Sequence, residues 1–223
     1  MFLSEFPGHL YRLCNRGRLF LISRISIFKK SIKGHAFHNF TSVGMCSYKV
    51  NNIKISCRIL GENITNRLKD FSQNSNLVST KLGNFFVLRQ KFVFIIFYSG
   101  HVNCTKIKSM TQIPEVMQKL NELFPDLQVN YTQTDNISAS GVLLNSKINL
   151  FELSQHFKDN SQAHHFNPQL FPGLYTKYNS ATFIIFKTGK FVCVGTKSIS
   201  ELEQVCEKFE ENINKFLRNH ECL

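Results

Sequence analysis

A phrase of 16 residues occurs twice in this chain of 223 residues, and the repetition constrains the fold more than any single motif does. Residues 94–109 read FIIFYSGHVNCTKIKS and residues 183–198 read FIIFKTGKFVCVGTKS, with 8 of the 16 positions identical at a constant offset of 89. A period of about 90 residues is the size of a small domain and too long for a solenoid unit. The sequence therefore predicts a duplicated half-domain, and duplicated halves commonly pack about a pseudo-twofold axis.

The charge of the chain favours a polyanionic partner. The chain carries 27 basic and 15 acidic residues, which gives a formal net charge of +12. Basic side chains neutralise phosphates and release the counterions that surround them. A molecule with a pseudo-twofold axis also suits a ligand that has its own dyad, and duplex nucleic acid is such a ligand. A soluble protein with a basic surface and no such partner is the alternative interpretation.

Residues 1–44 differ in composition from the rest of the chain. They hold seven basic residues and one acidic residue, whereas residues 45–223 hold 20 basic and 14 acidic residues. An acid-poor, Arg-rich segment is typical of a transit peptide, and a disordered basic arm or a gene-model extension before Met45 would look similar. We expect a basic leader at 1–44, a first repeat at 45–128, a second repeat at 129–218 and a tail at 219–223.

Several classes of site have little support in the sequence. The seven cysteines are odd in number and none has CxxC spacing, which argues against a disulfide framework and favours a reducing compartment. His164-His165 is adjacent and lacks metal-ligand spacing, so an exposed loop is the prediction there. No apolar run approaches the roughly 20 residues of a membrane span. No nucleophile–base set, carboxylate pair or phosphate loop stands out, so we expect no catalysis, no metal and no cofactor.

The sequence of each half predicts a strand and a helix, followed by further strands and a second helix. In the first half we expect a strand from residue 49 to 59, a helix at 64–71, a polar loop at 72–80, strands at 85–88, 92–98 and 101–106, and a helix at 113–124. In the second half we expect a strand at 129–140, a helix at 148–158, a turn into a strand at 171–173, and strands at 183–186 and 191–194. A final helix, capped by Ser198 or Ser200, carries an apolar stripe at Ile199, Leu202, Cys206, Phe209, Ile213 and Phe216.

The repeated FIIF segments place apolar side chains on both faces of a strand. Alternate side chains of a strand point to opposite faces, so Phe94 and Ile96 share one face while Ile95 and Phe97 share the other. The same division applies to residues 183–186. Helices can cover only one of these faces. The second face is then either a sandwich or dimer interface, or an apolar surface that presses on a ligand.

Residues 167–197, NPQLFPGLYTKYNSATFIIFKTGKFVCVGTK, resemble the second repeat of the TATA-box-binding protein family. The shared pattern is FPGL followed by IF-x-(S/T)-G-K. The first repeat resembles its counterpart more weakly, through FIIFYSG and the Asn52-Ile53 pair. The resemblance covers about residues 48–218 and implies an α+β fold. This fold is a duplicated saddle, with a curved antiparallel sheet below and helices on the convex side.

The resemblance also implies a function. It implies a sequence-selective general transcription factor of the nucleus that binds and bends AT-rich, TATA-like promoter DNA through the minor groove. Such a factor nucleates preinitiation complex assembly, so its partners are double-stranded DNA, general transcription factors and the RNA polymerase machinery. Minor-groove readers depend on shape, deformability and inserted wedges, because the groove distinguishes little beyond A·T from G·C. An interaction scaffold of the same fold, with lost or altered DNA selectivity, is the alternative.

Site residues follow from the resemblance. Phe171 and Phe186 match the wedge pair of the second repeat, and Phe97 matches one wedge of the first. The partner of Phe97 is open, because Leu82 takes that position when the hairpins are aligned and Phe85 lies close by. The further matches are Asn52 and Asn136 at the dyad, Ile95, Thr105, Ile184, Val192 and Val194 on the floor, and Lys108, Lys177, Lys190 and Lys197 along the DNA backbone.

The chain departs from the family pattern at defined positions. Small apolar floor residues of the family are replaced by Lys54, Asn103, Ser138 and Thr182, and Lys106 interrupts the Thr-Gly turn of the first repeat. Asn167 and Gln169 replace an acidic pair that helps to dock the next general transcription factor. These changes indicate a divergent member, such as a related factor, whose second half binds DNA in the more familiar way.

Overall fold

The computed structural model describes residues 46–143 and 147–220. The chain divides into two compact units, Met1–Ser42 and Val43–Leu223, and the described residues belong to the second. The expected leader at 1–44 lies outside the described residues, as does the end of the expected tail. Over the described ranges, no helix is both long and apolar enough to cross a membrane.

The two halves of the Val43–Leu223 unit repeat one order of elements. The first half contains β1 (Cys46–Leu60), α2 (Ile64–Asn74), β2 (Val78–Leu82), β3 (Phe85–Arg89), β4 (Val93–Phe97), β5 (His101–Ile107), the short helix η2 (Met110–Gln112) and α3 (Ile113–Leu123). The second half contains β6 (Gln128–Leu143), α4 (Leu150–Asp159), β7 (His164–His165), β8 (Gly173–Tyr178), β9 (Ala181–Phe186), β10 (Lys190–Thr196) and α5 (Ile199–His220). A long strand, a helix, four shorter strands and a second helix therefore occur twice.

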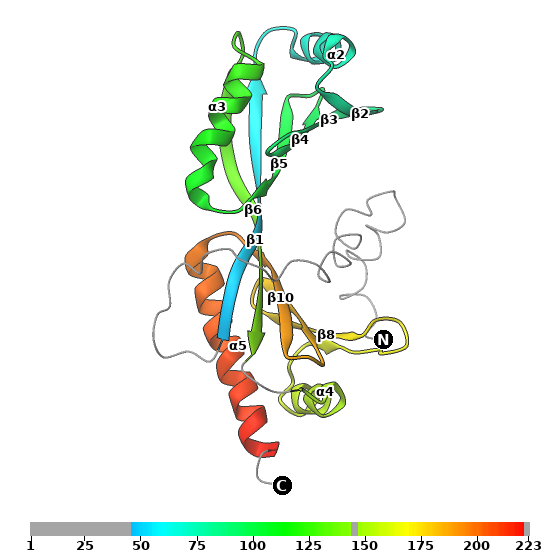
Figure 1. Ribbon diagram of the computed structural model, residues 1–223, viewed down its shortest axis with the longest axis vertical. Helices are drawn as coiled ribbons and strands as arrows, with labels where there is room; N and C mark the ends of the chain where they lie inside the picture. The colour runs from blue at the N-terminus through cyan, green and yellow to red at the C-terminus, as the bar shows by residue number, and fades with distance from the viewer. Residues whose placement is uncertain (1–45, 144–146, 221–223) are drawn as a thin grey trace. The chain divides into compact units, whose positions relative to one another are not determined.

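The strands form one ten-stranded antiparallel sheet. Its order is β2-β3-β4-β5-β1-β6-β10-β9-β8-β7, so the two halves extend outward in the same sequence from a central β1–β6 pair. Ile53 of β1 lies opposite Ile137 of β6 near the middle of this pair. Figure 1 shows β1 and β6 running through both halves. The predicted pseudo-twofold axis therefore passes between β1 and β6.

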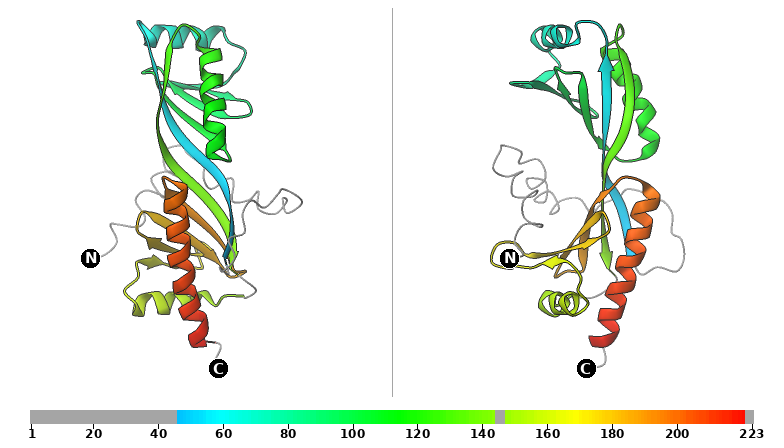
Figure 2. Two further views of the ribbon diagram at one scale, coloured as in Figure 1. Left: turned by 90° about the vertical axis from the view of Figure 1, so that its left-hand side faces the viewer. Right: turned by 180° about the vertical axis from the view of Figure 1, so that it is seen from behind.

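The helices cover one face of the sheet. Along β1, Ile53, Ile55, Cys57 and Ile59 are buried, as their alternation predicts. Figure 2 shows α3 and α5 lying along the same side of the sheet, while α2 and α4 lie at its two ends. The opposite side carries no helix from the described ranges, and we call it the open face. The arrangement confirms the expected α+β saddle.

The last helix is anchored as its apolar stripe predicts. Ser198 Oγ accepts a hydrogen bond from the Glu201 N–H at 3.1 Å, so Ser198 is the N-cap. On the helix, the stripe residues Leu202, Cys206, Phe209, Ile213 and Phe216 are buried. The ring of Phe209 stacks on Phe183 at 4.0 Å, with an interplanar angle of 16°. The helix ends at His220, two residues beyond the expected end of the second repeat.

Two segments predicted as loops contain the outermost strands of the sheet. α2 continues to Asn74 and β2 begins at Val78, so the predicted loop at 72–80 is wrong at both ends. His164 and His165 form β7, pairing with Thr176 and Tyr175 of β8, instead of an exposed loop. An edge strand pairs on one side only and is often short. Strands of two to five residues, most of them polar, give too little alternation to be recognised from sequence.

The turn around Lys106 is kept in the backbone despite its altered sequence. Lys106 adopts a φ of 73° and Gly195, at the matching place in the second half, adopts a φ of 110°. The Lys106 N–H donates to Asn52 Oδ1 at 2.7 Å, and the Gly195 N–H donates to Asn136 Oδ1 at 2.7 Å. A left-handed lysine costs about 1–2 kcal/mol, and the hydrogen bond to Asn52 offsets part of that cost.

Candidate nucleic-acid interface

The open face carries a band of apolar side chains. Ile95 and Phe97 are partly exposed there, while the adjoining Phe94 and Ile96 are fully buried beneath the helices. Phe186 is likewise partly exposed, and Ile184 is 7% exposed. The register places further apolar side chains on this face: Val87, Tyr175, Val192 and Val194. The strand alternation predicted from the two FIIF segments is therefore confirmed.

One end of the band carries the aromatic pair predicted for the second half. The rings of Phe171 and Phe186 lie 6.0 Å apart, and Tyr175 lies 5.1 Å from Phe171. Gly173 pairs with Phe186 across the β8–β9 ladder. A Cβ atom at Gly173 would lie 2.6 Å from the ring of Phe171. The glycine therefore leaves the space that the Phe171 ring occupies.

The other end of the band also carries an aromatic pair, which the sequence only partly identified. The rings of Phe85 and Phe97 lie 5.4 Å apart, and the two residues are paired across the β3–β4 ladder. Leu82 pairs with Phe85 from the edge strand β2 and is 54% exposed. The rings next to Phe97 are therefore those of Phe85 and of His101, at 5.7 Å, and Leu82 lies one strand further out than Phe85.

The two aromatic pairs are built from the same backbone register by different residues. Phe85 pairs with Phe97 as Gly173 pairs with Phe186, so Phe85 and Gly173 occupy matching places. The order is Gly83-Asn84-Phe85 in the first half and Phe171-Pro172-Gly173 in the second. Nothing lies within 4 Å of a Cβ placed at Gly83. In the first half this space is thus filled by the Phe85 ring on β3. In the second half it is filled by the Phe171 ring, from the turn that precedes β8.

Asn52 and Asn136 lie on the central strand pair and are oriented alike. Each side-chain Oδ1 accepts a backbone N–H at 2.7 Å, from Lys106 and Gly195 respectively. These bonds occupy the acceptor end of each amide. The Nδ2 donors are consequently the ends of the amides that can serve a ligand.

The floor positions of the two halves match in register and differ in chemistry. Asn103 pairs with Ile95 on β4, and Val192 pairs with Ile184 on β9. Thr105 and Val194 follow two residues later, both partly exposed. Thr182 pairs with Val194, and Ser138 lies opposite Val194 on β6. The floor of the second half is therefore mainly apolar, with hydroxyl groups beside it.

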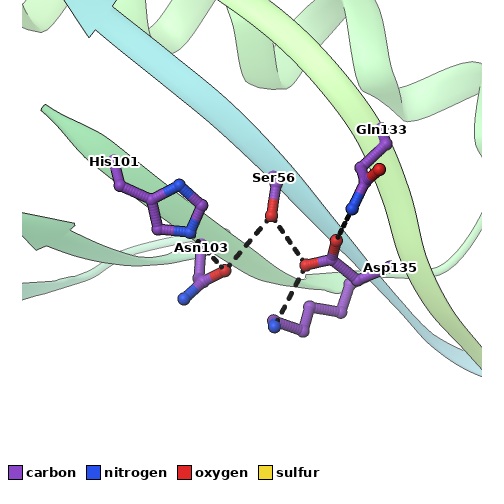
Figure 3. Close-up of polar contacts among 6 residues, drawn as sticks. Ser56, His101, Asn103, Gln133 and Asp135 are labelled. Atoms are coloured by element: carbon purple, nitrogen blue, oxygen red, sulfur yellow. Dashed lines mark hydrogen bonds and ion pairs between the residues drawn. The ribbon is translucent and has the colours of Figure 1, made fainter.

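A polar network occupies the floor of the first half. Ser56 Oγ donates to Asp135 Oδ2 at 2.7 Å and lies 3.4 Å from Asn103 Oδ1. His101 Nε2 lies 3.3 Å from the same Asn103 oxygen, and Gln133 Nε2 donates to Asp135 Oδ1 at 2.9 Å. Figure 3 shows these side chains converging from β1, β5 and β6. The sequence had identified Asn103 as a departure, but not the carboxylate beside it.

Asp135 is held as an ion pair. Its carboxylate lies 3.0 Å from Lys54 Nζ, and 17% of its side chain is exposed. Burial by itself would raise the pKa of Asp135, but hydrogen bonds from Ser56 and Gln133 and the contact with Lys54 together hold that pKa below its usual value. The network therefore presents a carboxylate whose charge is largely balanced by Lys54.

The predicted backbone-contacting lysines differ in their surroundings. Lys190 is partly exposed at the start of β10, whereas Lys177 and Lys197 are exposed. Lys108 directly follows β5, and its Nζ donates to the Asn51 carbonyl of β1. In the described ranges no group of three or more His, Cys, Asp or Glu side chains is placed to hold a metal ion. The candidate interface is thus a mostly apolar surface with amide donors at its centre.

Comparisons with known proteins agree with this architecture. A family model described as transcription factor TFIID (or TATA-binding protein, TBP) matches residues 132–216, which is essentially the second half. The TATA-box-binding protein of Picrophilus torridus is 25% identical over 132 residues, covering 56% of this chain and 70% of that protein. The Methanopyrus kandleri protein of the same name is 27% identical over 134 residues, covering 56% and 72%.

A solved structure matches the fold over most of its length. The Methanococcus jannaschii TBP superposes with a TM-score of 0.64 at 24% identity, covering 75% of this chain and 98% of that one. The duplicated halves, the central β1–β6 pair and the open face define a saddle-shaped protein of the TBP-like fold. These similarities support the assignment of the chain to the TATA-box-binding protein family.

Proposed function

We propose that this protein is a general transcription factor that binds AT-rich, TATA-like DNA through the minor groove and bends it. The observation that carries the proposal is the open apolar face with an aromatic pair at each end. Such a face fits the sugar edges of a widened minor groove. Its apolar floor does not suit a small polar ligand.

The central amides supply the polar part of the fit. The minor groove of an A·T pair presents only acceptors, adenine N3 and thymine O2. Asn52 and Asn136 have their own acceptor oxygens engaged by backbone N–H groups, which leaves the Nδ2 donors for a base. Two donors on either side of the pseudo-twofold axis suit two adjacent A·T steps at the dyad of the DNA.

The aromatic pairs supply the deformation. Phe171 with Phe186, and Phe85 with Phe97, lie at the two ends of the open face and are partly exposed. Inserting such rings between base steps costs a few kcal/mol per step and kinks the duplex, which is the mechanism known for the TATA-box-binding protein and is carried over here from that family. Lys108, Lys177, Lys190 and Lys197 are proposed to contact the phosphates, so that affinity falls as salt rises.

The helical side is proposed to face the transcription machinery. Glu203, Glu207 and Glu211 are exposed on α5, on the side opposite the open face. Acidic side chains there would repel DNA and favour basic protein partners. We accordingly infer that the protein nucleates preinitiation complex assembly in the nucleus, with general transcription factors and RNA polymerase as partners.

A scaffold of the same fold without selective DNA binding is the second candidate. The observation that favours it is the polar network at Lys54, Ser56, Asn103 and Asp135, which places a carboxylate on the open face. A scaffold would keep the saddle for its protein partners alone. The two candidates differ in what they predict for duplex DNA.

A gel-shift titration separates the two candidates. An AT-rich duplex and a G·C-rich duplex of equal length are titrated with the full chain at one fixed salt concentration. We expect the AT-rich duplex to bind at least about tenfold more tightly, because each unsuitable base pair costs about 1–3 kcal/mol. Equal affinity for the two duplexes, or no binding to either, would favour the scaffold.

A further inference from the structure

The two halves of the open face differ most in polarity at the matched floor positions Asn103 and Val192. Asn103 pairs with Ile95 and Val192 pairs with Ile184, and the two isoleucines occupy the same place in the repeated FIIF segments. At this position the first half therefore has an amide side chain, whereas the second half has the two methyl groups of a valine. The amide also has Ser56 as its cross-strand neighbour on β1.

The oxygen of Asn103 has capacity for another hydrogen bond. The single hydroxyl proton of Ser56 goes to Asp135 Oδ2, because that contact is 2.7 Å while the one to Asn103 Oδ1 is 3.4 Å. The remaining contact of the Asn103 oxygen is His101 Nε2 at 3.3 Å. A carbonyl oxygen has two lone pairs, so a stronger donor can still be accepted.

The carboxylate of Asp135 adds a second acceptor. Its two oxygens receive hydrogen bonds or an ion pair from Ser56, Gln133 and Lys54. A carboxylate offers about four lone-pair sites, which leaves room for one more donor. Because Lys54 balances the charge, the approach of a phosphate-bearing ligand is less opposed than it would be by a lone acid.

Only one group in the minor groove is a hydrogen-bond donor, and it is the exocyclic amine of guanine. An apolar floor removes water from this amine and gives no partner in return, which is why such a floor rejects G·C pairs. A floor with an acceptor removes that penalty. Acceptors on the first half alone would make the two halves unequal in base preference.

We propose that the first half of the open face admits a G·C pair and that the second half admits only A·T pairs. This inference rests on the proposed function. The guanine amine donates to Asn103 Oδ1 or to an Asp135 oxygen. The amide of Asn103 also holds donor hydrogens for adenine or thymine, so the first half accepts A·T as well. The DNA site is accordingly asymmetric although the protein fold is nearly twofold.

The test uses four duplexes that share a symmetric AT-rich site. One is unaltered, two carry a single G·C replacement at the symmetric position of either half, and one carries both replacements. The protein can turn around on a symmetric site and place a single G·C pair under its first half. We therefore expect each single replacement to raise Kd by less than about threefold, and the double replacement to raise it by about tenfold or more.

Asn103→Val gives the floor of the first half the residue of the second. With this variant we expect a single replacement at either position to raise Kd by about tenfold relative to the variant's own Kd for the unaltered AT-rich duplex. Glu207→Ala, on the exposed face of α5, is the control and should behave as the wild type does. Circular dichroism of both variants verifies that they are folded.

The outcomes separate the inference from the proposed function. If the wild type binds the unaltered duplex but each single replacement already costs about tenfold, with the two costs adding, the inference fails and the proposed function stands. If no duplex is bound, the proposed function fails first. If the Asn103→Val variant still binds each singly replaced duplex within about threefold of the unaltered one, the amide is not the acceptor of the guanine amine and the inference is overturned.

Discussion

Replacing Phe171 and Phe186 together by alanine is expected to raise the Kd for an AT-rich duplex by about 100-fold or more, or ~2.7 kcal/mol. The two rings lie 6.0 Å apart at one end of the open face, and both are partly exposed in the absence of DNA. Their removal eliminates one of two wedges, and truncating an aromatic residue that anchors an interface typically costs about 2 kcal/mol or more. Fluorescence anisotropy of a labelled duplex at fixed salt measures the change.

A matched control distinguishes this effect from a general loss of aromatic surface. Phe151 lies on α4, the helix at one end of the sheet, and is 68% exposed. Phe151→Ala should leave DNA binding within about twofold of wild type, consistent with a surface substitution away from the site. A double variant that is folded and binds as tightly as wild type would show that the ring pair is not a wedge.

The same assay decides the wedge partner of Phe97. Phe85 lies 5.4 Å from Phe97 ring to ring, whereas Leu82 belongs to the edge strand beyond it. We expect Phe85→Ala to weaken DNA binding by about tenfold or more, and Leu82→Ala to weaken it by less than about threefold. If Leu82→Ala weakened DNA binding more than Phe85→Ala did, Leu82 would be the wedge partner of Phe97, at the position that the hairpin alignment gives it.

Phe209→Ala is expected to lower the free energy of unfolding by about 3–5 kcal/mol. Phe209 is fully buried, and its ring contacts Phe183, Phe191 and Tyr178 at centroid distances of 4.0, 5.4 and 5.8 Å. Truncating it leaves a cavity where α5 packs on three strands and removes a stacked aromatic pair. Urea unfolding followed by circular dichroism gives the change in midpoint.

The exposed face of the same helix provides the comparison. Glu207 is exposed on α5, and Glu207→Ala should change the free energy of unfolding by no more than about 0.5 kcal/mol. If Phe209→Ala also fell within that range, the helix would contribute little to the core. DNA binding of the Phe209 variant is measured only at temperatures where the protein remains folded.

Sequence periodicity predicted the parts of the fold that are set by burial. β1 and α5 each have one buried face, and their apolar residues recur at the spacing of a strand and a helix. The same alternation in the two FIIF segments predicted the open face. The edge strands β2 and β7 were missed because pairing on one side, rather than burial, makes them strands.

The candidate site was predictable where a motif carried it, and not where pairing created it. Phe171 and Phe186 follow from FPGL and FIIF, but Phe85 becomes the partner of Phe97 only through the β3–β4 register. The Lys106 turn depends on an acceptor at Asn52, 54 residues earlier in the chain. Asp135 joins the floor of the first half because β6 crosses into it, which no local pattern reveals.

The bend angle of DNA in the complex tests the central claim most directly. An AT-rich duplex with a donor and an acceptor dye at its ends is titrated with the full chain, and the end-to-end distance is followed by energy transfer. We expect saturable binding to shorten that distance by an amount that corresponds to a kink in the range of about 20–90°, which inserted side chains produce in this family. Saturable binding with no change in distance would contradict the proposal that the open face bends DNA.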